Sequence, residues 1–250
     1  MATTAAYLEP YLPIPHPALP LILTPPRPST DYDRQVSTLN DPKIARNLVG
    51  PPYPYSREMA EAWGAVRLTD TESVFRALGE DADRQEREQH VVVGIGTDEQ
   101  AEGKWEPKRP NGLPFASLRR EDTGEWIGEI AVQRWQFREV DDPDERERLV
   151  SENEAKEAGD ETIVWSFGYY LHPSYHAQSI ASSALHAVLN SYLIPFLGAR
   201  HIRATAFADN LASLRVQEKQ GLKKLGVFRH DISESRGGGT TEEVVMEWKA

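Results

Sequence analysis

Residues 169–189 combine a proline-containing corner with groups that bind anions. The segment reads YYLHPSYHAQSIASSALHAVL, in which apolar and aromatic residues precede His172-Pro173 and a run with helical spacing follows. The pattern predicts a strand that ends at Leu171 and a helix that begins near Ala177. The first N–H groups of such a helix point back toward the strand end, and with the helix dipole they bind phosphate groups. The corner therefore predicts an anion site that suits a pyrophosphate.

Other short patterns that could carry chemistry are weaker. His172 and His176 have the four-residue spacing of a helical metal pair, but Pro173 disfavours a helix between them and no third ligand follows, so we predict no metal site. The GIGT and RGGGTT segments lack the remaining residues of nucleotide-binding loops, and no serine lies in a G-x-S-x-G context. A hydrolase triad therefore has no support.

Composition limits the remaining possibilities. The chain has 250 residues, a net charge of −11 and no cysteine. The negative charge argues against a nucleic-acid surface, and the absence of cysteine excludes a thiolate nucleophile and cysteine-based zinc sites. There is no apolar run long enough to span a membrane and no secretory leader pattern, so we expect a cytoplasmic protein, with the nucleus as the alternative.

The predicted elements place the corner in a mixed sheet. Two short helices are expected from residue 29 onward, with Ser29, Thr30 or Asp31 as the first cap and Asp41 as the second. Helical segments after Ser56 and a strand at residues 90–97 precede a hairpin formed by residues 113–120 and 125–135. The remainder alternates strand and helix through residues 162–172, 179–197, 200–208, 210–221, 222–230 and 242–249. This order predicts an α+β fold.

Two segments depart from this core. Residues 1–23 are so rich in proline that we expect an extended N-terminal arm lying on a single domain of residues 24–250. Residues 139–161 form an acidic insertion with eleven acidic and three basic side chains. This insertion is either a solvated helix or an electrostatic funnel for a cationic substrate.

Two consecutive segments carry a family resemblance, WSFGYYLHPSYHAQSIASSALHAVL and RHIRATAFADNLASLRVQEKQGLKKLGVFRH. Together they resemble the acetyl-CoA-binding core of the GNAT superfamily of N-acetyltransferases, most closely the Rim-type enzymes that acetylate ribosomal-protein N-termini. The segments LTPPRPSTDYD, LNDPKIARNL, GPPYPYS and TGEWIGEIAV extend the resemblance over residues 24–248. It implies the GNAT fold, a mostly antiparallel mixed sheet with flanking helices. The sheet would splay between its fourth and fifth strands, here residues 163–171 and 201–207.

The resemblance also implies a reaction. Acetyl-CoA would be the co-substrate in the splay, with its pantetheine arm pairing to exposed strand backbone. A primary amine would attack the thioester directly, aided by a backbone N–H near Leu171 that stabilises the oxyanion. Residues that would contact the co-substrate are Tyr170, Leu171, His176, Ala177, Gln178, Ser179, Ile180, Ala181, Asn210 and Ser213.

The sequence departs from the family pattern at three functional positions. Ser179 replaces a glycine of the pyrophosphate loop, and a serine with positive φ costs on the order of 1 kcal/mol. Ser166 and Gln217 stand where relatives carry a glutamate and a tyrosine for proton transfer, and neither can transfer a proton at neutral pH. Glu129 is therefore our first candidate for the acid/base group, with His172 second. Tyr53, Tyr55 and Trp135 are either core aromatics or walls of an acceptor pocket.

Two functions from different classes follow. The first is an acetyl-CoA-dependent N-acetyltransferase that acts on a small-molecule or peptide amine. The alternative is a degenerate GNAT domain, with a substituted cofactor loop, that serves as a non-catalytic binding or regulatory module. Neither reading needs a nucleic acid or a membrane, and association into a homodimer stays open.

Overall fold

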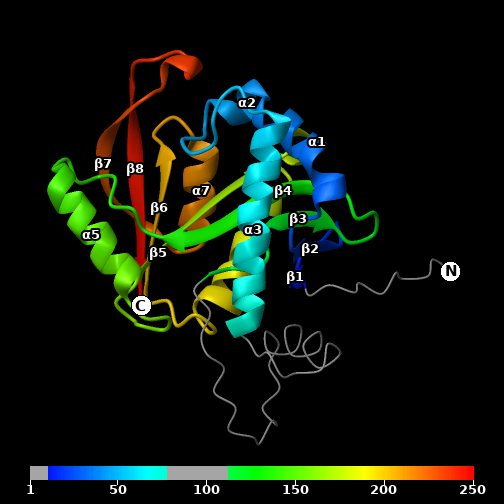
Figure 1. Ribbon diagram of the computed structural model, residues 1–250, viewed down its shortest axis with the longest axis horizontal. Helices are drawn as coiled ribbons and strands as arrows, with labels where there is room; N and C mark the ends of the chain where they lie inside the picture. The colour runs from blue at the N-terminus through cyan, green and yellow to red at the C-terminus, as the bar shows by residue number, and fades with distance from the viewer. Residues whose placement is uncertain (1–10, 78–111) are drawn as a thin grey trace, which may run out of the picture.

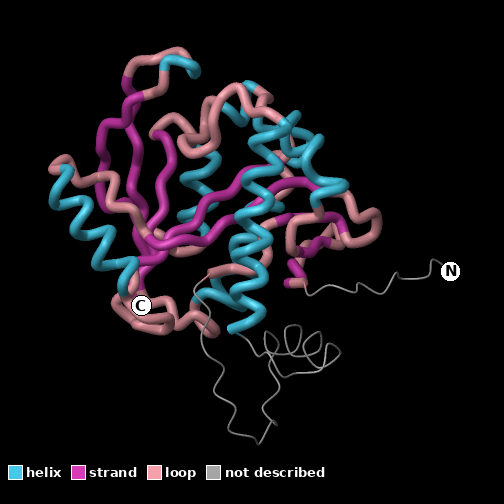
Figure 2. Tube along the Cα trace, viewed as in Figure 1, coloured by secondary structure: helices cyan, strands magenta, loops and turns pink. Residues whose placement is uncertain are grey.

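The computed structural model describes residues 11–77 and 112–250 of the chain. Eight strands form one sheet in the order β1-β2-β3-β4-β5-β6-β8-β7, and all neighbours are antiparallel except β5 and β6. Figure 1 shows the helices of the first half of the chain over one face of the sheet, and Figure 2 shows the strands as one twisted layer. The predicted α+β, mostly antiparallel GNAT-like sheet is confirmed. The predicted strand at residues 90–97 lies outside the described residues.

The first half of the chain supplies one edge of the sheet and the helices that cover it. The strands are β1 (Leu12–Ile14) and β2 (Leu21–Thr24), and the helices are α1 (Pro28–Leu39), α2 (Pro42–Ala45) and α3 (Arg57–Ala77). The hairpin of β3 (Ser117–Arg120) and β4 (Trp126–Arg134) turns at Gly124, whose φ of 71° favours glycine.

The second half alternates strand and helix. Its elements are α5 (Pro143–Ala155), β5 (Val164–Leu171), η1 (Pro173–Tyr175), α6 (Ile180–Ala187), the π-helical η2 (Val188–Leu193), β6 (His201–Phe207), α7 (Leu211–Lys219), β7 (Lys223–Asp231), η3 (Glu234–Arg236) and β8 (Thr240–Lys249).

The proline-rich segment does more than lie on the domain. β1 contains Pro13, which an edge strand tolerates, and β2 bonds to β1 on one side and to β3 on the other. The expectation of an arm that only lies on the domain is therefore wrong for Leu21–Thr24, a proline-free run of four buried residues inside the sheet.

A buried ion pair replaces the expected cap of α1. The helix begins after Arg27, and Asp31 lies within its first turn, where its carboxylate accepts the Arg27 N–H at 2.8 Å. The same carboxylate binds the fully buried guanidinium of Arg119, which also donates to Thr24 at 2.8 Å. Asp31 thus ties α1 to β2 and β3. The predicted cap at Asp41 is confirmed, because its carboxylate accepts the Lys43 N–H. Ser56, which precedes α3, accepts the Met59 N–H in the same way.

The sheet has a hydrophobic layer on each face. Trp165, Phe167 and Leu171 of β5 pack against α6 and η2 in the larger core, whereas Tyr170 points to the opposite face and packs beside Tyr32 and Tyr55. This alternation follows from the two-residue period of a strand. The consequence is that β5 presents side chains to two compartments.

Candidate active site

The sheet opens between β5 and β6. The two strands pair only at Val164–His201, Trp165–Ile202 and Ser166–Arg203. Beyond Ser166, β5 continues to pair with β4, and β6 continues to pair with β8. The expected splay is therefore present, and the β5 backbone from residue 167 to residue 171 faces it without a partner strand.

The backbone of Leu171 faces the splay. His172 donates its N–H to the carbonyl of Ile127 on β4 at 2.8 Å. Because successive residues of a strand point their N–H groups to opposite edges, the N–H of Leu171 points away from β4 and into the splay. This is the orientation that an oxyanion donor at the end of β5 requires.

A cleft of about 1340 Å³ runs through the splay. One half lies toward α6 and α7, and the other half lies toward α1, α2 and α3. Among its lining side chains are six basic ones, Lys43, Arg46, Arg67, Arg138, Arg215 and Lys219, against the acidic Glu129 and Glu243. In a chain of net charge −11, this cleft is locally suited to an anionic ligand.

The loop before α6 has the backbone shape of an anion site. Ala177 and Ser179 adopt left-handed conformations with φ of 59° and 63°. The sequence predicted a helix start near Ala177, but α6 begins at Ile180. Residues 176–179 are exposed. The early N–H groups of α6 and the left-handed residues before it can form a concave set of donors.

Ser179 retains the conformation for which glycine is suited. Its side chain makes no capping hydrogen bond to α6. A hydroxyl there is thus available to a ligand, while the backbone keeps the left-handed turn at a cost of roughly 1–2 kcal/mol. The substitution changes the side chain but leaves the backbone geometry of the loop in place.

The cleft brings together all ten residues expected to contact the co-substrate. Tyr170, Leu171, all six residues 176–181, Asn210 and Ser213 line it. Asn210 accepts the N–H of Ser213 at 3.1 Å and so caps α7. The ring of His176 lies 3.0 Å from the Leu171 carbonyl, and Gln178 donates to the Ser174 carbonyl. These contacts fix the loop against the end of β5.

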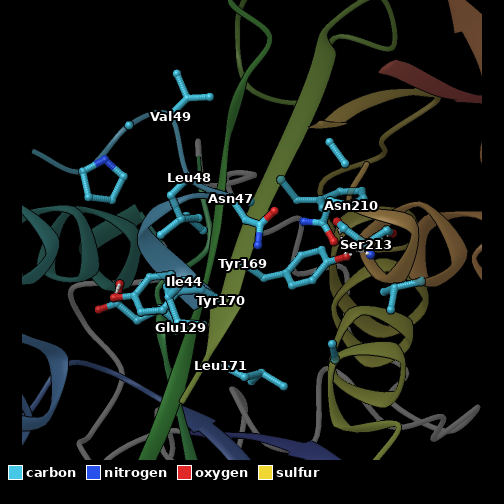
Figure 3. Close-up of a pocket in the computed structure, with 18 of the residues that line it drawn as sticks. Ile44, Asn47, Leu48, Val49, Glu129, Tyr169, Tyr170, Leu171, Asn210 and Ser213 are labelled. Carbon is cyan, nitrogen blue, oxygen red and sulfur yellow. Dashed lines mark hydrogen bonds between the residues drawn. The ribbon is translucent and has the colours of Figure 1, made fainter. Parts of the chain in front are cut away.

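Glu129 lies on the other side of β5, opposite Tyr170 in the strand register. Its carboxylate accepts hydrogen bonds from the Tyr170 hydroxyl at 2.7 Å and from the Gln35 amide at 3.0 Å. Burial raises the pKa of Glu129, although the bond from Tyr170 and the charge of Arg67 oppose the shift. Figure 3 shows Glu129 and Tyr170 together beside Ile44 and Leu48. This carboxylate can take up a proton inside the cleft.

His172 occupies a different position. It is not among the residues that line the cleft; its Nδ1 accepts the Ser174 N–H at 3.3 Å and its ring packs against Tyr175. Partial burial and the charge of Arg34 lower its pKa. The structure therefore brings Glu129, but not His172, to the site. Tyr55 and Trp135 line the cleft, whereas Tyr53 does not.

Tyr169 is a site residue that the sequence patterns did not single out. From β5 its hydroxyl reaches across the splay to Ser213 Oγ at 2.9 Å (Figure 3), and burial raises its pKa to about 12. Gln217, at the position where relatives carry a tyrosine, instead donates to the Thr205 carbonyl and is buried. The alternation of β5 could have shown that Tyr169 faces the α7 side.

The family assignment follows from comparison with known proteins. The model of the acetyltransferase (GNAT) domain matches residues 20–223, so the chain belongs to the GNAT acetyltransferases. A search of curated protein sequences finds no match.

Within the described residues no group of three or more potential ligands forms a metal site, and no helix is long and apolar enough to cross a membrane.

Solved structures share the fold at low identity. An acetyltransferase (GNAT family) from Bacillus anthracis is 12% identical, with 96% of this chain and 98% of that chain covered and a TM-score of 0.57. RimJ of Mycobacterium smegmatis in complex with CoA-disulfide is 14% identical, with coverage of 96% and 87% and a TM-score of 0.53. The microcin C7 self-immunity acetyltransferase MccE, in complex with acetyl-CoA and AMP, is 10% identical, with 92% of each chain covered and a TM-score of 0.54.

Proposed function

We propose that this protein is an acetyl-CoA-dependent N-acetyltransferase that acts on a primary amine by direct attack, within the Rim-type branch that the sequence resembles. The observation that supports this most directly is the splay of β5 and β6, which opens onto the left-handed loop before α6. Two structural neighbours hold CoA or acetyl-CoA. The basic lining of the cleft suits the phosphates of such a co-substrate.

Different residues of the chain would bind the co-substrate, stabilise the oxyanion and accept the proton. Acetyl-CoA would supply the acetyl group as a thioester, with its phosphates at residues 176–181 and its pantetheine arm along β5. The Leu171 N–H would stabilise the negative charge that develops on the carbonyl oxygen as the C–N bond forms. Glu129 would accept the proton that the attacking ammonium must lose, directly or through the Tyr170 hydroxyl.

The second proton transfer concerns the departing thiolate. When the C–S bond breaks, the sulfur takes up a proton, and Gln217 cannot donate one. The Tyr169 hydroxyl, hydrogen-bonded to Ser213 in the splay, is the phenol on the co-substrate side of β5 that can supply it. Its raised pKa keeps the hydroxyl protonated at neutral pH.

Calorimetric titration with acetyl-CoA, accompanied by a thermal-shift series, tests the proposal. We expect saturable binding in the micromolar range, a rise in melting temperature with ligand concentration, and amine-dependent release of free thiol. An absence of heat and of a thermal shift at millimolar acetyl-CoA would contradict it. That outcome would favour the non-catalytic module, because the chain would then have the GNAT fold without binding the co-substrate of the reaction.

A further inference from the structure

One face of α3 is an exposed apolar stripe inside the cleft. Met59, Trp63 and Val66 are 39%, 41% and 50% exposed, and all three line the cleft. Their spacing of four and three residues places them on one helix face over about 10 Å. Large apolar side chains that stay exposed along a cleft mark a surface for a ligand rather than a core.

α2 and the loop after it supply a second apolar wall. Ile44, Leu48 and Val49 line the same cleft, and Val49 is 37% exposed. Figure 3 shows these three residues on the side of the sheet where Glu129 and Tyr170 lie. We call the half of the cleft toward α1, α2 and α3 the acceptor half. It has apolar walls around the carboxylate of Glu129.

Arg67 adds a cation to this half. It follows Trp63 by one helical turn, and its guanidinium lies over the Trp63 ring at 4.5 Å from the centroid. The Arg67 side chain is 14% exposed, and the nearest carboxylate that pairs with it among residues 11–77 and 112–250 is Asp70, at 4.0 Å. By contrast, Arg138 in the same cleft binds Glu243 at 2.5 Å.

The position of Arg67 bears on Glu129. The charge of Arg67 lowers the pKa of Glu129 against the larger effect of burial, so the guanidinium acts within the electrostatic range of that carboxylate. Within residues 11–77 and 112–250, Arg67 pairs with no carboxylate closer than 4.0 Å. A guanidinium held in this way against an aromatic ring is suited to bind a carboxylate or phosphate. The acceptor half thus offers one acidic group, two apolar walls and, in Arg67, a guanidinium within the electrostatic range of that acid, with Lys43 and Arg46 lining the α2 side.

We infer that the acceptor is a small amphoteric amine with a large apolar body, as an apolar amino acid is. This inference rests on the proposed function. The amine lies toward Glu129, the acidic group binds Arg67, and the apolar body packs against Trp63 and its neighbours on α3. A polyamine would bring a second cation toward Arg67, and an amino sugar would leave the apolar walls without a partner.

The experiment compares two amines that differ by one carboxylate. Thiol release is measured with L-tryptophan and with tryptamine, alongside spermidine and glucosamine. We expect kcat/KM for L-tryptophan to exceed that for tryptamine by roughly 10- to 100-fold, the range of a charge-assisted hydrogen bond. Spermidine and glucosamine should be poorer than both. Similar values for L-tryptophan and tryptamine, or a preference for spermidine, would overturn the inference.

Matched variants assign the effect to Arg67. Arg67→Gln should bring the ratio of kcat/KM for L-tryptophan to that for tryptamine close to one, because only the carboxylate loses its partner. Loss of the Arg67 charge also raises the pKa of Glu129, but this effect is common to both amines and cancels in the ratio. Arg57→Gln is the control, since Arg57 lies on the same helix but pairs with Glu61 outside the cleft. An equal loss for both amines in Arg67→Gln would indicate a structural role and contradict the inference.

Two further readouts separate this inference from the proposed function. If acetyl-CoA binds but no amine of the panel is acetylated, the acceptor class is wrong while the proposed function stands. If acetyl-CoA does not bind, the proposed function fails, and thermal shifts with L-tryptophan and tryptamine in the wild type and Arg67→Gln test the amine site alone. Equal shifts, or none, would then overturn the inference as well.

Discussion

Ser179 holds a left-handed backbone that an L-amino acid adopts at a cost. Replacement by glycine removes roughly 1–2 kcal/mol of strain but frees the unfolded chain by about 0.4–1 kcal/mol. For Ser179→Gly we therefore expect a free energy of unfolding between unchanged and about 1 kcal/mol higher. Acetyl-CoA affinity should be unchanged or tighter.

Denaturant unfolding and calorimetric titration check both parts of the Ser179 prediction. Ser174→Gly is the control, because Ser174 lies in the preceding η1 without a positive φ and should lose stability. A marked loss of acetyl-CoA affinity in Ser179→Gly would show that the hydroxyl, and not the backbone, holds the phosphate.

Glu129 couples activity to pH-dependent stability. Its folded-state pKa is raised, mainly by burial, so at low pH it is protonated in both states and contributes nothing. As the pH rises from the unfolded-state value through the folded-state value, the unfolded chain loses its proton more readily and stability falls. Glu129→Gln should therefore raise the melting temperature at pH 7 and have little effect near pH 4.

The same substitution should lower kcat/KM by roughly a hundredfold or more, because a general base is lost. Melting curves at the two pH values and a pH–rate profile check the pair of effects. Glu242→Gln, at an exposed position of β8 outside the cleft, should change neither. A variant that keeps full activity would rule out Glu129 as the base.

At the scale of elements, α5 is docked through one buried side chain. Asn153 donates to the Val164 carbonyl at 2.9 Å and accepts the Val164 N–H at 2.9 Å, so its amide continues the pairing of β5. The neighbouring Arg134 binds the last carbonyls of this segment, including that of Lys156 at 2.8 Å. The acidic segment is thus a fixed helix rather than a loose insertion.

Asn153→Ala would leave the buried Val164 N–H without its partner and would remove one of the two hydrogen bonds to the Val164 carbonyl, which keeps the Trp135 N–H. We expect a loss of about 2–4 kcal/mol in the free energy of unfolding, with activity at low temperature retained because α5 does not line the cleft. Glu152→Gln on the same helix removes only an exposed pair with Arg148 and should cost at most about 0.5 kcal/mol. Equal losses in the two variants would contradict the docking role.

The elements also show what the sequence can and cannot predict. The β3–β4 hairpin and the alternation from β5 to α7 follow from local periodicity and turn residues, so they were predictable. The interior place of β2 was not, because it depends on pairing with residues about one hundred positions away. For the same reason Glu129 could be proposed from the sequence, but its contact with Gln35 on α1 could not. The positive φ of Ala177 could not be predicted from the sequence, because alanine is not a residue type that favours the left-handed region.

For the whole molecule, the charge distribution separates the acidic helix from the site. The chain carries −11, yet the cleft is lined mainly by basic side chains, and no residue of α5 lines it. Figure 1 shows α5 away from α1, α2 and α3. At physiological salt the field of an exposed charge is screened beyond about 8 Å. The acidic segment is therefore a solvated face in this arrangement, and the cationic-substrate funnel has little structural support.

Neutralising part of that face tests the separation. The triple variant Asp144→Asn, Glu145→Gln, Glu147→Gln should change KM for tryptamine by less than about twofold at 0.15 M salt, since screening removes the field before it reaches the cleft. Lys219→Gln, within the cleft on the α7 side, should instead raise KM for acetyl-CoA severalfold and more at low salt, because a basic side chain that faces the co-substrate is lost. If the triple variant raised the KM for tryptamine severalfold while acetyl-CoA was unaffected, the acidic helix would have to guide the amine, and the acceptor would be selected by charge before it reached the apolar walls of α3.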